Sequence, residues 1–133
     1  MTEHYHVLVW IDHREAKVFQ FNATDTDNTR IRSEHPHQHI HHHANARGSG
    51  HVPLDKEFLK HVAEAIAHAG AILITGPANA KTELAQYIKE AHPALAQKIS
   101  GVEPLDHPTD GELLALARAF FKADDRMHPQ THR

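Results

Sequence analysis

The order of strand-type and helix-type patterns is the feature that most restricts the fold of this chain. Three short segments with strand character come first: His6–Ile11, Ala16–Phe21 and Thr29–His35. Helical and strand patterns then alternate from Asp55 onward. Strands joined by short turns pair antiparallel, whereas strands joined through a helix pair parallel. This order therefore predicts a mixed sheet with helices packed on it.

The first three segments are predicted to form a meander. Asp12–Glu15 is short and polar and lies between two apolar runs, which is typical of a hairpin. Ile31 lies between Arg30 and Arg32, which suits a half-exposed third strand. Asp25–Asn28 is expected to supply the turn before it.

The second half of the chain predicts three helices and two strands. The expected elements are a helix Asp55–Ala69, a strand Ala71–Thr75, a helix Ala80–Ala91, a strand Lys98–Leu105, and a last helix capped by Thr109. The apolar residues expected to pack from the last helix are Leu113, Leu114, Leu116, Ala117 and Phe120.

The resulting order βββαβαβα predicts an α/β fold of the ribonuclease-H-like type, with a mixed five-stranded sheet. A length of 133 residues suits one domain, so 1–133 is expected to fold as a unit. Residues 124–133 are expected to form a disordered tail.

Composition excludes several classes of protein. The chain has no cysteine, so disulfides, thiolate metal sites and cysteine nucleophiles are excluded. A net charge of −3 argues against a protein that coats nucleic acid through bulk charge. The amino terminus lacks an export-signal pattern, and every apolar run is far shorter than the roughly 20 residues of a membrane span. We therefore expect a cytoplasmic protein without membrane contact.

Histidine is the compositional anomaly, with 16 residues. The polar stretch 36–53 is rich in histidine and is expected to form a flexible loop. Alternate positions of a strand share one face, so an extended third strand would align four imidazoles that suit zinc or nickel. These candidate metal ligands are His35, His37, His39 and His41. The alternative is a solvated loop without a physiological metal.

A ribonuclease-H-like order also raises a metal-dependent nuclease as an alternative. Asp12 follows the first strand, where such enzymes place a carboxylate, and the first helix offers Glu57 and Glu64. The fourth strand ends in Thr75-Gly76-Pro77, where another acid would be needed, so the acidic set is incomplete. The competing interpretation is that Asp12 closes the first hairpin turn.

Two further features could meet phosphate. Gly76-Pro77-Ala78 lies between a strand and a helix, but its spacing with Lys81 is not that of a nucleotide-binding loop, so a tight turn is favoured. Four cations could also form a modest site for a nucleic-acid backbone along the first three strands: Arg14, Lys17, Arg30 and Arg32.

Three segments together resemble the middle domain of archaeo-eukaryotic release factors and Pelota. They are Val9–Ala16, Ile74–Lys81 and Gly101–Asp106, and the resemblance covers about residues 5–122. The whole chain is also similar to the small bacterial proteins called translational machinery proteins. Those proteins share a histidine-rich loop and a segment like Asp106–Gly111 before the final helix.

The resemblance implies contact with the ribosome or transfer RNA, with the loop directed at a functional centre. Release factors carry a Gly-Gly-Gln tripeptide in this loop, whereas this chain has Arg47-Gly48-Ser49-Gly50-His51, and Gln38 has no adjacent glycine. No catalytic residue is therefore assigned, and the chain is expected to lack hydrolytic activity.

The sequence thus favours a non-catalytic translation factor for rescue, quality control or hibernation, which requires no cofactor. A metal-binding protein and a nuclease are the alternatives. An exposed edge on the third strand permits a monomer or a homodimer. Imidazole, guanidinium and ammonium groups can contact RNA phosphates, and imidazole and guanidinium groups can also stack on bases. The expected contact residues are His39, His41, His42, His43, Arg47, His51, Lys56 and Lys81.

Overall fold

A mixed five-stranded sheet forms the centre of the computed structural model, which describes residues 6–21, 26–33 and 55–127. The strands lie in the order β3-β2-β1-β4-β5. β1 pairs antiparallel with β2 and parallel with β4; β2–β3 is antiparallel and β4–β5 parallel. The strands are β1 His6–Ile11, β2 Glu15–Phe21, β3 Thr26–Arg32, β4 Ala71–Gly76 and β5 Ile99–Pro104.

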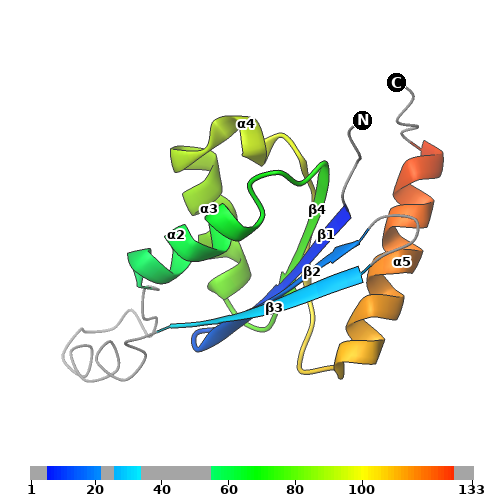
Figure 1. The fold of residues 1–133 in the computed structure, drawn as a ribbon, viewed down its shortest axis with the longest axis horizontal. Helices are drawn as coiled ribbons and strands as arrows, with labels where there is room; N and C mark the ends of the chain where they lie inside the picture. The colour runs from blue at the N-terminus through cyan, green and yellow to red at the C-terminus, as the bar shows by residue number, and fades with distance from the viewer. Residues whose placement is uncertain (1–5, 22–25, 34–54, 128–133) are drawn as a thin grey trace.

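Helices cover the sheet unequally on its two faces (Figure 1). Three helices, α2, α3 and α4, lie on one face, and α5 lies alone on the other. Their bounds are α2 Lys56–Ala65, α3 Ala80–Ala91, α4 Pro93–Ala96 and α5 Asp110–Met127. This arrangement confirms the predicted ribonuclease-H-like α/β fold. None of the helices within the described ranges is long and apolar enough to span a bilayer.

The central strand β1 supplies side chains to both cores because alternate residues of a strand point to opposite faces. Val9 and Ile11 pack toward α2 and α3, together with Ile74 of β4. Leu8 and Trp10 pack toward α5. Every residue of β1 from Val7 to Ile11 is buried, which is why this strand is an almost unbroken apolar run.

Several predicted boundaries were wrong, most of all those of β3 and α2. β3 ends at Arg32 rather than at His35. β3 begins at Thr26 rather than Thr29, because backbone pairing with β2 takes in Asp27 and Asn28, residues that the sequence placed in a turn. Tertiary pairing here overrides weak strand propensity. α2 ends at Ala65, before the predicted Ala69, where the N–H of Ile66 donates to Ala63 three residues back and tightens the last turn.

The final helix begins as predicted, and four of the five residues expected to pack do so: Leu113 and Ala117 are buried, Leu114 and Phe120 pack against them partly buried, and Leu116 does not. The backbone N–H of Thr109 donates to the Glu112 carboxylate at 2.9 Å, and that of Glu112 donates to Oγ1 of Thr109 at 3.1 Å, which forms a capping box. Leu113, Ala117 and Phe121 are buried at four-residue spacing, whereas Leu116 is 39% exposed. The helix continues to Met127, so 124–127 are helical and not part of a tail.

Candidate functional site

The three segments that carry the family resemblance converge at one end of the sheet. β1, β4 and β5 are parallel, so their carboxyl ends share one edge. There the N–H of Leu105, just beyond β5, donates to the carbonyl of Gly76 at 3.0 Å. In open α/β sheets, ligands bind outside the carboxyl ends of the strands, which makes this end the candidate functional site.

Gly76 allows β1 and β4 to meet closely at this end. Its φ angle of 146° lies in a region that residues with a side chain rarely adopt. A Cβ atom there would lie 2.1 Å from the carbonyl oxygen of Ile11. The strand-to-helix turn therefore needs a glycine for steric reasons, which supports its interpretation as a structural turn.

Lys81 belongs to the same turn. Its ammonium group donates to the carbonyl of Ala78, and Ala78 itself has a positive φ of 52°. Lys81 thus stabilises the turn through this hydrogen bond, in addition to any role in binding. Lys56, the first residue of α2, is exposed to solvent.

Asp12 closes the β1–β2 turn, as the second interpretation of the sequence proposed. Its Oδ1 accepts from the backbone N–H groups of Arg14 and Glu15 at 2.8 and 2.9 Å. Its Oδ2 lies 3.8 Å from Nε2 of His107. In the described part of the chain, Asp12 forms no group with Glu57, Glu64 or other acids or histidines that could hold a metal ion.

The loop between β5 and α5 docks onto Trp10, a contact that sequence reasoning missed. The indole N–H donates to the carbonyl of Asp106 at 2.7 Å, and the His107 ring meets the indole edge at 5.2 Å between centroids. Lys17 lies 5.5 Å from the centre of the same indole and pairs with Asp110 at 3.0 Å. The Asp106–Gly111 resemblance was the available signal for this loop.

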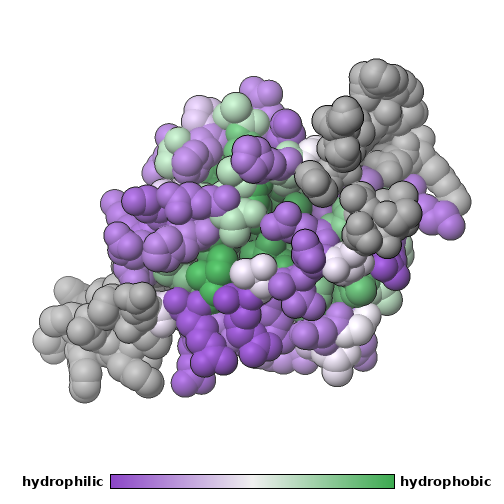
Figure 2. All heavy atoms as spheres, viewed as in Figure 1, coloured by the Kyte–Doolittle hydropathy of each residue, from purple (hydrophilic) through white to green (hydrophobic). Residues whose placement is uncertain are grey.

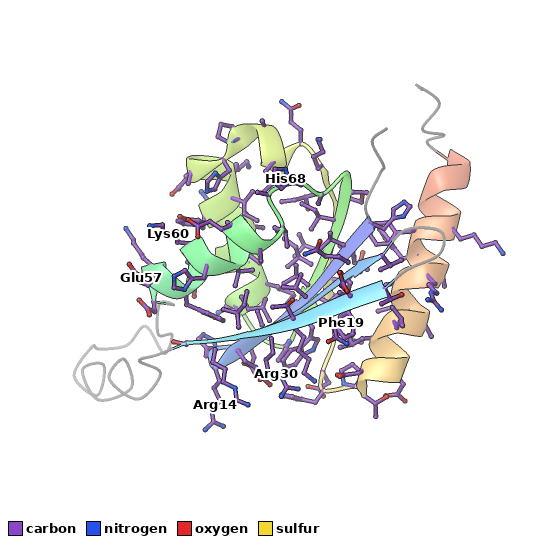
Figure 3. The ribbon with its side chains drawn as sticks, viewed as in Figure 1. Arg14, Phe19, Arg30, Glu57, Lys60 and His68 are labelled. Carbon is purple, nitrogen blue, oxygen red and sulfur yellow. The ribbon has the colours of Figure 1, made fainter. Side chains whose placement is uncertain are left out.

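Basic side chains gather next to this loop on the α5 face of the sheet. Lys17 pairs across the strands with Arg30, and Glu15 with Arg32, so all four share one face. The guanidinium of Arg30 lies 3.3 Å from the Glu15 carboxylate. Arg14 and Arg30 project on the side of the sheet away from α2 (Figure 3), and hydrophilic residues cover this region (Figure 2). The structure thus confirms the shared basic face, not a bound ligand.

The chain leaves the described residues at this same end. The N–H of Ser33 donates to the carbonyl of Arg14 at 2.9 Å, which ties the end of β3 to the β1–β2 turn. The chain returns at Asp55, which caps α2 by accepting the N–H of Glu57 at 3.2 Å. Residues 34–54 lie outside the described residues, and with them the candidate ligands and contacts His35, His37, His39, His41, His42, His43, Arg47 and His51.

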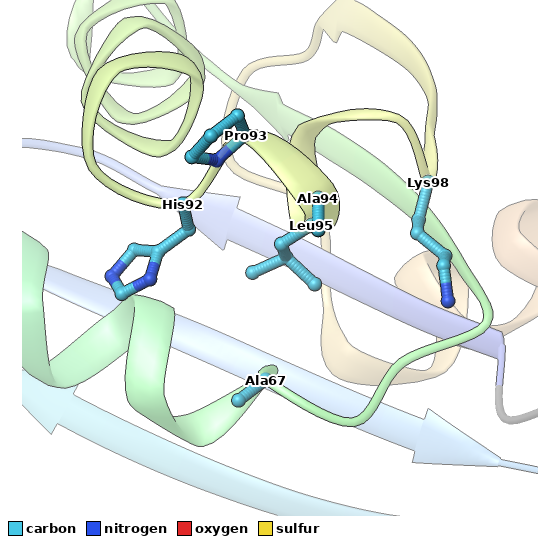
Figure 4. A pocket seen from close by; sticks show the side chains of 6 residues that line it. All are labelled: Ala67, His92, Pro93, Ala94, Leu95 and Lys98. Atoms are coloured by element: carbon cyan, nitrogen blue, oxygen red, sulfur yellow. The ribbon is translucent and has the colours of Figure 1, made fainter.

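A pocket of about 390 Å³ lies at the opposite end of the sheet (Figure 4). The carbonyl of Lys98, one of its lining residues, accepts the N–H of Ile72 at the beginning of β4. None of the residues predicted to bind a ligand lies in this pocket. Its walls are formed by Ala67, His92, Pro93, Ala94, Leu95 and Lys98.

No family model matches this chain, and no curated protein matches its sequence significantly. Solved structures match its fold. Pelota of Archaeoglobus fulgidus aligns at 14% identity with a TM-score of 0.60, over 96% of this chain and 37% of Pelota. Pelota of Thermoplasma acidophilum aligns at 14% identity and 0.58, over 91% and 34%.

The archaeal translation termination factor aRF1 aligns at 13% identity and a TM-score of 0.56, over 92% of this chain and 39% of that factor. This chain therefore spans less than two-fifths of the length of each of these three proteins. At such identities the likeness concerns the fold, and the fold of this chain is that of a domain found in Pelota and aRF1.

Proposed function

We propose that this chain is a non-catalytic translation factor that binds the ribosome or transfer RNA and uses the histidine-rich stretch 36–53 as a probe. Rescue of stalled ribosomes, quality control and hibernation are the processes in which such binding would act. The proposal includes the cytoplasm as its location.

The observation that carries the proposal is the fold shared with Pelota and with a translation termination factor over more than nine-tenths of this chain. Fold alone does not fix function, so the position of the probe matters as a second support. The chain enters the stretch beside Arg14 and leaves it beside Lys56, at the end of the sheet where the three resembling segments converge.

The chemistry of the stretch suits RNA. Imidazole and guanidinium groups donate to phosphate oxygens and stack on unpaired bases. We assign these contacts to His39, His41, His42, His43, Arg47 and His51, with Lys56 and Lys81 contributing at the edge of the domain. The absence of a Gly-Gly-Gln tripeptide supports binding without peptidyl-transfer-RNA hydrolysis.

Ribosome sedimentation of the untagged chain from growing and stationary cells tests the proposal. We expect the chain in ribosomal fractions at low salt and its release as salt rises, because phosphate contacts exchange with counterions. The double variant Arg47→Gln/Lys56→Gln should be released at clearly lower salt. A chain absent from every ribosomal fraction would contradict the proposal.

Lys89→Gln/Lys122→Gln is the matched control, since it removes the same charge from exposed positions in the last turn of α3 and the later part of α5. Both positions lie toward the end of the sheet opposite the candidate site, and Phe121, beside Lys122, contacts His6 at the start of β1. This control should sediment as the natural chain does. If it is released equally early, general charge explains the binding and the assigned residues do not.

Metal binding by His35, His37, His39 and His41 is a separate proposal. It predicts one zinc or nickel ion per chain after purification without an affinity column, and loss of that ion in His37→Gln/His39→Gln. Metal analysis together with sedimentation of the same variant shows whether ribosome binding depends on the ion.

A further inference from the structure

A second pocket lies between the β1–β2 turn and the end of β3. It measures about 340 Å³, within the roughly 300–1,000 Å³ of small-ligand pockets. Its walls are Arg14, Glu15, Arg32 and Ser33. Two of these four are arginines, and both are exposed to solvent.

The charge in this pocket is not balanced. The Glu15 carboxylate lies 3.3 Å from Nε of Arg30, whose side chain is 47% exposed. The charge of Glu15 is therefore already compensated by Arg30. Among the described residues, neither Arg14 nor Arg32 pairs with a carboxylate. Two guanidinium groups therefore flank one pocket with their charge uncompensated, and guanidinium binds phosphate through paired N–H groups.

Within the described residues, the pocket is held in shape and no helix covers it. The hydrogen bond from Ser33 to Arg14 fixes the end of β3 against a turn that Asp12 closes. α5 reaches β3 near its beginning, where Arg118 donates to Thr26 at 3.3 Å, and Arg32 at the other end of the strand stays exposed. A ligand on this face can therefore reach Arg14 and Arg32, whose backbone positions are fixed by these hydrogen bonds.

We propose that Arg14 and Arg32 form a binding site for a phosphate of an RNA backbone. The site itself follows from the geometry, and its assignment to RNA rests on the proposed function. One phosphate held here would place the RNA strand beside Ser33, three residues before the histidine-rich stretch 36–53 in the sequence.

Fluorescence anisotropy with a labelled RNA duplex of twelve base pairs tests this site. Arg14→Gln/Arg32→Gln should weaken binding at low salt by about tenfold or more, since charge-assisted hydrogen bonds are lost. The slope of log affinity against log salt should become shallower by about one in the double variant, because one phosphate contact is lost. Arg14→Lys/Arg32→Lys should keep the slope, and Lys89→Gln/Lys122→Gln should keep both slope and affinity.

Inorganic phosphate separates two ligands with the same chemistry. Side-chain Nε–H signals of Arg14 and Arg32 that shift with phosphate, together with RNA affinity unchanged in the glutamine variant, would overturn RNA as the ligand. Signals that shift with neither phosphate nor RNA would overturn the site. Thermal unfolding at an unchanged temperature shows that the glutamine variant is folded.

The outcomes also separate this inference from the proposed function. RNA binding that depends on both arginines, without any ribosome sedimentation, would refute the proposed function and keep the site. Ribosome sedimentation that is unaffected by Arg14→Gln/Arg32→Gln, with RNA affinity also unaffected, would refute the site and keep the proposed function.

Discussion

The two faces of the sheet differ in how completely they are covered. Among the described residues, 17 buried residues form one core cluster on the face of α2, α3 and α4, whereas nine form the cluster under α5. α5 is the one described helix on its face, and it does not extend over the end of β3. Aliphatic residues dominate the larger cluster, and aromatic rings such as Trp10, Phe19 and Phe121 are prominent in the smaller one.

This difference indicates which residues stabilise the fold and which are available to bind a ligand. The covered face has alternate β2 residues such as Ala16 and Val18 buried in its core, whereas the open face presents Lys17 and Arg30 from the same two strands. At the open end of this face, Arg14 and Arg32 pair with no carboxylate among the described residues. We therefore expect substitutions in either core to change stability and substitutions of these two arginines to change binding.

The largest expected effect on stability is at Gly76, the last residue of β4, in the sheet that both cores share. Gly76→Ala would force a Cβ against the carbonyl of Ile11 at a φ of 146°. Backbone strain and overpacking together should lower the free energy of unfolding by about 4 kcal/mol. Urea unfolding followed by circular dichroism measures it.

Gly111→Ala is the control, because a Cβ there comes no closer than 4.0 Å to a neighbouring atom, Oγ1 of Thr109. It should leave stability unchanged or raise it by about 0.5–1 kcal/mol, since alanine favours the helix. Equal effects of the two substitutions would show that the close approach of β1 and β4 is not a constraint.

The second prediction compares one leucine from each face. Leu84 of α3 and Leu113 of α5 are both fully buried. Leu84→Ala and Leu113→Ala should each lower the free energy of unfolding by about 3 kcal/mol, because both remove a packed side chain and leave a cavity. Chemical unfolding of both variants measures the two losses. Equal losses would show that the two cores differ in size but are equally well packed.

Leu116→Ala provides the control on the same helix, since its side chain is 39% exposed. The change should cost less than about 0.5 kcal/mol. A cost below about 1 kcal/mol for Leu113→Ala would mean that α5 is loosely attached, and the comparison of the faces would fail.

The smallest effect concerns the pair that links the open face to α5. Lys17 and Asp110 lie 3.0 Å apart, with side chains 19% and 54% exposed. A double-mutant cycle with Lys17→Met and Asp110→Asn should give a coupling of about 0.5 kcal/mol that falls as salt is added. A coupling that does not respond to salt would point to packing of Lys17 on Trp10 instead.

The element order was predictable because it depends on local periodicity and turns. α3 begins at Ala80 and ends at Ala91 as its pattern predicted, and the Thr109 cap is present. The start of β3 was not predictable, since Asp27 and Asn28 favour turns locally and become strand through pairing with β2. Short α4 was also missed, although Pro93 at its first turn is a typical start signal.

The candidate site was predictable in its parts and not in its assembly. The sequence identified Asp12, the Gly76 turn and the Arg14 and Arg32 cations separately. Their convergence depends on strand order and register, which no local pattern encodes. The Trp10 contact with Asp106 joins residues 96 positions apart, so only the folded chain reveals it.

Trp10 is the sole tryptophan of the chain and is 3% exposed. Its indole touches the β5–α5 loop through Asp106 and His107 and lies under Lys17. The natural protein thus contains a single tryptophan, which can be excited selectively, beside its candidate binding surface. Its emission should be that of a shielded indole and should shift to longer wavelength when this loop detaches, which allows ligand-induced changes to be followed without a label.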